Sequence, residues 1–170
     1  PSLVVVKKSV TPNDIELCKN VMEQALKKYP YNENSVLANY ILGVAYEKSN
    51  DFVNAQKQYE KVHKIEENVF ENQMAYARIL RTNGFVAQSM EVLSKINSQN
   101  SNNIELLKQN AYSAFDAGNF DLAETYVAKV LQQTPNDLSF VLFRAKILIE
   151  KNDYIHAVSL LDMYERQHVD

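Results

Sequence analysis

The side chains that most often carry chemistry are few in this sequence, and they do not converge. The histidines His63, His156 and His168 are dispersed and share no helix face. The single cysteine, Cys18, lies on the apolar stripe of its segment, where a cysteine behaves as a small hydrophobic residue. Zinc sites and nucleophilic catalysis need several such groups at defined spacings. We therefore expect no catalytic residues, no metal site and no cofactor.

Acidic pairs and glycines do not change this expectation. Glu66 and Glu67 are adjacent near the end of a predicted helix and would not converge on a substrate. The three glycines, Gly43, Gly84 and Gly118, are isolated, so no phosphate-cradling loop is present in the sequence. The interpretation that follows is a protein that is not an enzyme.

Composition favours a helical, soluble chain. Of 170 residues, 46% are hydrophobic and 23% charged, and only three Gly and four Pro are present. The net charge of −3 gives no overall attraction to nucleic acid or an anionic membrane, and no apolar run approaches membrane-spanning length. We expect a cytoplasmic or other intracellular location. The chain does not begin with Met, which is compatible with a processed or excised piece, and whether it is a fragment of a longer repeat protein stays open.

The segments that are predicted to position side chains repeat along the sequence with a period of 34 residues. A turn column contains Asn or Gly, which tolerate left-handed backbone angles, and an apolar residue follows two places later. Two further columns contain small residues, which permit close helix packing. The four columns are Asn50, Gly84, Gly118 and Asn152; Phe52, Val86, Phe120 and Tyr154; Gly43, Ala77, Ala111 and Ala145; and Ala55, Ser89, Ala123 and Ala157. Apolar spacings of three or four residues predict two helices in each unit.

A helix–turn–helix unit of this length with these small columns resembles the tetratricopeptide repeat. The resemblance implies an all-α, right-handed superhelical solenoid of antiparallel helix pairs, with about four full repeats and an N-terminal half repeat. Pro135 matches the proline of that motif, whereas Asn39, Gln73, Asn110 and Arg144 depart from its bulky residues. We predict one continuous domain divided into a partial repeat at 1–35, with a helix at about 12–29, and repeats at 36–69, 70–103, 104–137 and 138–170.

Both ends of the repeat array carry specific expectations. Thr11 and Asp14 suit a capping box for the first helix, with Pro12 in its first turn. Residues 1–10 could be helix, strand or tail. No polar capping helix follows repeat 4, although terminal units of solenoids normally need one. We therefore expect either a longer solenoid, a partner over this end, or self-association through it.

The resemblance also nominates a concave peptide-binding groove. In that family the first helices of the units line the groove, and repeat positions 2, 5, 9, 12 and 13 face the bound segment. Carried onto this chain, these positions predict contacts from Tyr40, Val44, Met74, Arg78, Arg81, Lys108, Tyr112, Phe115, Leu142 and Lys146. The central cations lie among aromatic and apolar side chains, so we expect a protein segment with acidic and apolar residues.

Three functions are compatible with a helical-repeat protein of this kind. The first is a non-catalytic protein–protein interaction scaffold, part of a larger multi-protein assembly. The second is a structural spacer or self-association module with an unused groove, and the third is an RNA-binding helical repeat, which the acidic chain and the 34-residue period disfavour. The carboxylate clamp that binds heat-shock chaperone tails in this family matches neither register of this sequence. We therefore expect protein partners other than such tails, and neither nucleic acid nor a membrane.

Overall fold

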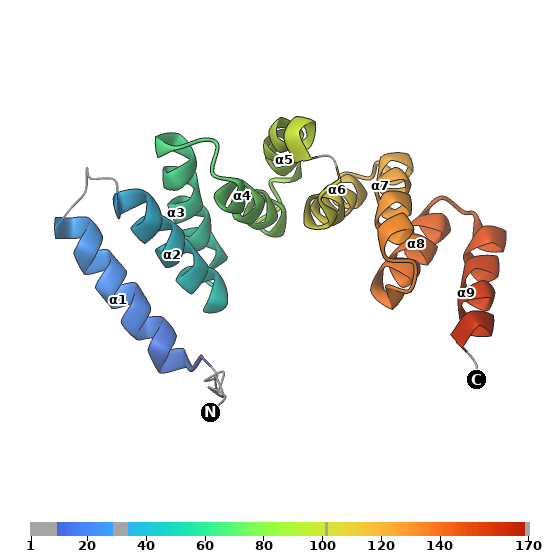
Figure 1. The fold of residues 1–170 in the computed structure, drawn as a ribbon, viewed down its shortest axis with the longest axis horizontal. Coiled ribbons are helices and arrows are strands. Elements are labelled where there is room, and N and C mark those ends of the chain that lie inside the picture. Colours follow the sequence, from blue (N-terminus) through green and yellow to red (C-terminus); the bar gives the residue numbers. More distant parts are fainter. Residues whose placement is uncertain (1–9, 29–33, 101, 169–170) are drawn as a thin grey trace, which may run out of the picture. The chain divides into compact units, whose positions relative to one another are not determined.

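A computed structural model describes residues 10–28, 34–100 and 102–168, and all of their regular structure is helical (Figure 1). The helices are α1 (Pro12–Lys28), α2 (Asn34–Lys48), α3 (Phe52–Ile65), α4 (Phe70–Thr82), α5 (Val86–Asn100), α6 (Ile104–Asp116), α7 (Phe120–Gln133), α8 (Leu138–Glu150) and α9 (Tyr154–His168). The second helices of the pairs begin at Phe52, Val86, Phe120 and Tyr154, which are 34 residues apart. The predicted all-α fold of helix pairs is confirmed.

The predicted turn column adopts the backbone conformation that its residue types indicate. Asn50, Gly84, Gly118 and Asn152 have φ of 60°, 86°, 73° and 61°. After each of them, the next amide donates a hydrogen bond to a carbonyl five residues earlier, as in a Schellman helix terminus. In one example the Asn119 amide reaches the Ala114 carbonyl at 2.9 Å. The left-handed residue thus ends the first helix and directs the chain into the second.

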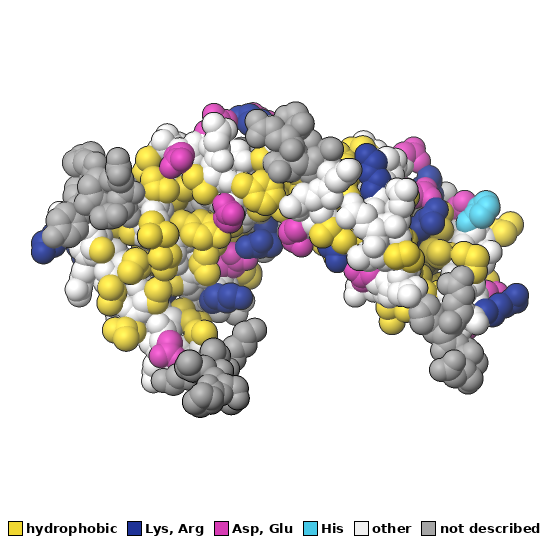
Figure 2. Space-filling view, in the orientation of Figure 1, with side chains coloured by type: hydrophobic (Ala, Val, Ile, Leu, Met, Phe, Trp, Pro, Cys, Tyr) yellow, Lys and Arg dark blue, Asp and Glu magenta, His cyan; other side chains and the backbone are white. Residues whose placement is uncertain are grey.

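Residues 1–72 form the first compact unit, which contains α1, α2 and α3. The predicted capping box of α1 is present: the Thr11 amide donates to Asp14 at 2.9 Å, and the Asp14 amide donates to Thr11 Oγ1 at 3.2 Å. Tyr46 on α2 donates to Glu23 on α1 at 2.6 Å, and this hydrogen bond raises the pKa of Tyr46 to about 12. Residues 1–9, whose structure the sequence leaves open, lie outside the described residues. Figure 2 shows many hydrophobic side chains on the visible face over α1 to α3.

The centre of this first unit is the contact between α2 and α3. Tyr59 on α3 is fully buried and donates to Glu47 on α2 at 2.9 Å. Its ring lies against Gly43, where an added Cβ would come within 2.6 Å of Tyr59 Cε1. Gly43 is therefore the small residue that makes room for the largest side chain of this core.

Residues 73–170 form the second compact unit, which contains most of α4 and all of α5 to α9. Its core lies between α6, α7 and α8, which pack in sequence (Figure 1). The buried residues of this core are Leu107, Ala111, Ala114, Ala123, Val127, Val130, Phe140 and Ile147. Ser89 replaces Ala in the second small column and donates to the Ala77 carbonyl at 2.7 Å, so its buried hydroxyl is satisfied.

Candidate binding site

The candidate site lies on α4, α6 and α8, the first helices of the pairs in the second unit. Two of these helices begin at a side-chain cap. Asn103 accepts a hydrogen bond from the Leu106 amide at 3.0 Å, and Asp137 accepts one from the Phe140 amide at 3.3 Å. Such caps satisfy amides that a helix start leaves free, and they fix where each helix begins. The register of α6 and α8 is thus set locally.

Aromatic rings form a continuous layer between α6 and α8. Tyr112 lies 5.6 Å from Phe140 and 5.0 Å from Phe143, measured between ring centroids. Phe115 lies 5.3 Å from Phe143 and 5.4 Å from Phe120, the first residue of α7. Tilted and edge-on pairs at these separations are favourable contacts beyond the area they bury. Tyr112, Phe115 and Phe143 are half-buried, so the layer also presents ring surface to solvent.

Each of three cations lies over a ring of this layer. The Arg81 guanidinium is 5.3 Å from the Tyr112 centroid, the Lys108 ammonium 4.7 Å from Phe140, and the Lys146 ammonium 4.6 Å from Phe115. These separations are within the range of cation–π attraction. The contacts link Arg81 on α4 through α6 to Lys146 on α8. We call these three cations, the rings they contact and Phe143, which lies between Tyr112 and Phe115, the cation–aromatic layer.

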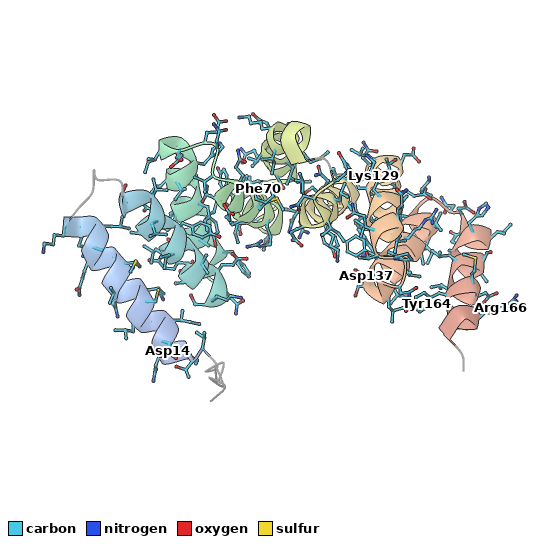
Figure 3. All side chains as sticks on the ribbon, in the orientation of Figure 1. Asp14, Phe70, Lys129, Asp137, Tyr164 and Arg166 are labelled. Atoms are coloured by element: carbon cyan, nitrogen blue, oxygen red, sulfur yellow. The ribbon has the colours of Figure 1, made fainter. Side chains whose placement is uncertain are left out.

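Two of the three cations are also paired with carboxylates of the chain itself. Arg81 lies 2.9 Å from Asp116, and Lys108 lies 2.9 Å from Asp137 (Figure 3 labels Asp137 at the start of α8). The hydrogen bond from Lys108 is the main cause that lowers the pKa of Asp137. Among the described residues, no carboxylate pairs with Lys146. Lys146 is therefore the cation of the layer whose charge no carboxylate of the described residues pairs with.

The structure does not bring all predicted groove residues together. Arg81, Lys108, Tyr112, Phe115 and Lys146 form the cation–aromatic layer described above. Leu142 is exposed on α8, and Arg78 is half-buried on α4. Met74 is only 6% exposed and so presents little surface. Tyr40 and Val44 belong to α2 of the first unit, where the Tyr40 ring lies 5.9 Å from Tyr59.

Sequence reasoning missed several members of this layer. Phe140 and Phe143 were not among the nominated groove residues. Both rings contact Tyr112; Phe140 also contacts the Lys108 ammonium, and Phe143 also contacts Phe115. Asp137 was missed as the partner of Lys108, but its place directly before an apolar helical segment is the usual signal for a capping residue. Which cation it reaches depends on the packing of α6 against α8, which the repeat period alone does not reveal.

The histidines and the cysteine that were considered for chemistry are dispersed over α1, α3 and α9. His156 Nδ1 lies 2.8 Å from Asp153, three residues earlier at the start of α9, and its ring is exposed. His63 and Cys18 are half-buried on α3 and α1, and the side chain of His168 lies outside the described part. Within the described ranges, no three His, Cys, Asp or Glu side chains gather as a metal site would require. No helix of the described chain is long and apolar enough to cross a bilayer.

Comparison with known proteins identifies the class of this fold. No family model matches the sequence, and no curated protein is significantly similar to it. Solved structures match over nearly the whole chain. MamA 41-end from Desulfovibrio magneticus RS-1 has a TM-score of 0.75 and 13% identity, covering 95% of this chain and 100% of that chain.

Two further matches agree. A crystal structure of MamA has a TM-score of 0.79 and 14% identity, covering 91% of this chain and 88% of that chain. YrrB, described as a TPR protein with an unusual peptide-binding site, has a TM-score of 0.76 and 19% identity, covering 88% of this chain and 76% of that chain. The chain thus has the tetratricopeptide-repeat fold, a solenoid of helix pairs, as its sequence pattern indicates. At these identities the likeness concerns the fold.

Proposed function

We propose that this protein is a non-catalytic protein-interaction scaffold that holds a partner segment on the cation–aromatic layer of its second unit. The segment carries apolar side chains and at least one carboxylate. The observation that supports this function is the continuous contact from Arg81 through Tyr112 to Phe115 and Lys146. Aromatic residues and arginine are enriched at protein-binding sites and among the residues that contribute most to binding.

The internal ion pairs refine which residues recognise the carboxylate. A partner carboxylate at Arg81 or Lys108 would have to compete with Asp116 or Asp137, so the exchange brings little net gain. At Lys146 there is no such competitor among the described side chains. We therefore assign the main charge contact to Lys146, and apolar contact to Tyr112, Phe115 and the exposed Leu142. This differs from a groove in which all cations are equally available.

Two further considerations favour a binding role for this protein. The layer offers ammonium, guanidinium and aromatic groups, which bind and orient a segment. YrrB, whose published description includes a peptide-binding site, has the same fold. We propose that binding of this kind places the protein in a larger assembly.

Selection from a library of random dodecapeptides displayed on phage tests this function. The proposal predicts that selected sequences combine an acidic residue with two or more apolar residues, and that their binding is lost when Lys146→Glu replaces the parent as bait. Lys129→Glu on α7 is the matched control, because Lys129 is likewise an exposed lysine whose ammonium lies 5.8 Å from a ring, that of Tyr126. Basic selected sequences, or equal retention by Lys146→Glu, would refute the proposal.

A further inference from the structure

The way α8 covers α6 and α7 provides a template for a second binding surface. On α6, Tyr112 and Phe115 lie 5.0 Å and 5.3 Å from the Phe143 ring of α8. On α7, Glu124 lies 2.8 Å from Lys151, the residue that ends α8. One face of a helix pair thus receives the next helix through rings on its first helix and carboxylates on its second.

Carboxylates of α7 hold Arg144 of α8 and Lys151, the residue directly after α8. Glu124 also lies 3.4 Å from Arg144, and Asp121 lies 2.7 Å from Lys151. The hydrogen bond from Lys151 is the main cause that lowers the pKa of Glu124. The α7 surface is therefore matched to a helix that carries two positive charges.

The same positions one repeat later, on α9, have the opposite character. Residues 34 places after Asp121 and Glu124 are Ile155 and Val158, whose side chains are 81% and 58% exposed. Both carboxylates are replaced by branched aliphatic residues. A helix with arginine or lysine at the positions of Arg144 and Lys151 would meet aliphatic side chains in place of the two carboxylates that α7 offers, which is costly.

The corresponding positions on α8 continue this surface. Residues 34 places after Lys108, Tyr112 and Phe115 are Leu142, Lys146 and Ile149. Leu142 and Ile149 are about half exposed, at 50% and 48%. Lys146 supplies one positive charge between them. The first helix of this pair therefore offers two apolar contacts and a site for one carboxylate.

The outer side of α9 is also hollowed. A shallow depression of about 370 Å³ is lined by Ile155, Val158, Ser159, Asp162, Met163 and Arg166. Figure 3 shows Arg166 on this outer side of α9 and Tyr164 on the opposite side. Together, Leu142, Lys146, Ile149, Ile155, Val158 and Met163 are called the α8–α9 docking face. Exposed apolar residues gathered on neighbouring helices in this way are typical of interaction sites on proteins.

We propose that the α8–α9 docking face binds an amphipathic helix of a partner protein, placed as α8 is placed on α6 and α7. The partner helix carries apolar residues where α8 carries Arg144 and Lys151, and one carboxylate that meets Lys146. The packing of α8 on α6 and α7 indicates where the partner helix lies. The aliphatic residues that stand in place of Asp121 and Glu124 indicate that its facing side chains are apolar. Lys146 and Leu142 also take part in the proposed function, so the helix and the segment described there compete for them, whereas Ile155 and Val158 belong to the docking face alone. The inference therefore rests on Ile155 and Val158, and variants at these two residues distinguish it from the proposed function.

A pair of peptides derived from α8 tests the proposal on the intact chain. Both cover residues 137–151, are labelled with fluorescein and carry Phe140→Glu to meet Lys146. The first also carries Arg144→Leu and Lys151→Leu, whereas the second keeps both cations. Fluorescence anisotropy should show that the parent chain binds the leucine peptide about tenfold more tightly than the cationic one.

Exchange of the two aliphatic residues should invert this preference. The double variant Ile155→Asp with Val158→Glu reproduces the carboxylates of α7, so it should lose the leucine peptide and gain affinity for the cationic one by about tenfold. Val53→Asp is the matched control, because Val53 holds the same repeat position in α3 and is 61% exposed. It should bind both peptides as the parent does, and circular dichroism verifies that each variant is folded.

Three outcomes would overturn the proposal. Binding of neither peptide by the parent chain, or equal binding of both, would exclude a helix with apolar residues at these positions as the occupant. Sedimentation of the parent as a dimer that Ile155→Asp with Val158→Glu dissociates would assign the face to a second copy of the chain. An unchanged preference in the double variant would place the peptide elsewhere.

Discussion

The ammonium of Lys108 on α6 lies 2.9 Å from the carboxylate of Asp137, and the same carboxylate caps α8 through the Phe140 amide at 3.3 Å. One side chain therefore links two helices and also sets where the second begins. This contact uses a cation that the sequence assigns to the binding groove. The charge of Lys108 is thus used within the chain, and Lys146 is left as the cation of the layer without a carboxylate among the described residues.

Asp137→Asn should remove the charge that pairs with Lys108 and keep the cap of α8, because Asn caps helices about as well as Asp. At about pH 7 we expect it to lower the free energy of unfolding by about 1 kcal/mol, because the pair is only partly exposed to solvent. The lowered pKa of Asp137 means that its ion-pair stability is present above the ordinary carboxyl range and is lost as pH falls through the lowered value.

Urea unfolding followed by circular dichroism measures this effect. The difference between the parent and Asp137→Asn should shrink toward zero as the pH falls through the lowered pKa of Asp137 and its carboxylate is protonated. Asp162→Asn on the exposed side of α9 is the control and should leave unfolding nearly unchanged. A pH-independent difference would show that the cap, and not the ion pair, carries the contribution.

Gly118 should be replaceable by Asn but not by Ala. Its φ of 73° is costly for residues with a Cβ, although nothing lies within 4 Å of the position an added Cβ would take. We expect Gly118→Ala to destabilise by about 1–2 kcal/mol. Gly118→Asn should cost clearly less, since Asn50 and Asn152 adopt the same conformation. Thermal unfolding of both variants would contradict this account if Asn were the worse substitution.

Gly43→Ala should destabilise for a different reason, which is contact with a side chain. The new Cβ would lie 2.6 Å from Tyr59 Cε1, and such overpacking typically costs about 1–3 kcal/mol. In a Tyr59→Leu background the added cost should be much smaller, because Ala77 occurs with Leu93 at the same two repeat positions. A double-mutant cycle with no coupling between positions 43 and 59 would argue against a direct clash.

Phe85→Asp is expected to stabilise the protein. Phe85 precedes α5, is 47% exposed, and holds the position at which Asp51 and Asn119 cap α3 and α7. A capping carboxylate before α5 should add about 1 kcal/mol to the free energy of unfolding. Asn119→Ala, which removes an existing cap, should have the opposite sign. Destabilisation by Phe85→Asp would indicate that packing of the Phe85 ring outweighs the cap.

The repeat pattern predicts the fold better than the site, and particular residues show why. The turn at Gly118 and the capping box at Thr11 are local, so residue types at fixed offsets are enough to predict them. Burial of Met74 and the pairing of Arg81 with Asp116 depend on how α4 packs against its neighbours. Repeat positions place these side chains on a helix face, but side-chain reach and neighbour identity decide whether they contact solvent or each other.

The most direct test of the central claim is the affinity of one selected acidic and apolar peptide for the parent, Lys146→Glu and Lys129→Glu, measured by isothermal titration calorimetry. The account predicts a loss of about tenfold or more for Lys146→Glu and no change for Lys129→Glu, because only Lys146 lies in the cation–aromatic layer. Equal affinities for all three chains would contradict recognition at this layer.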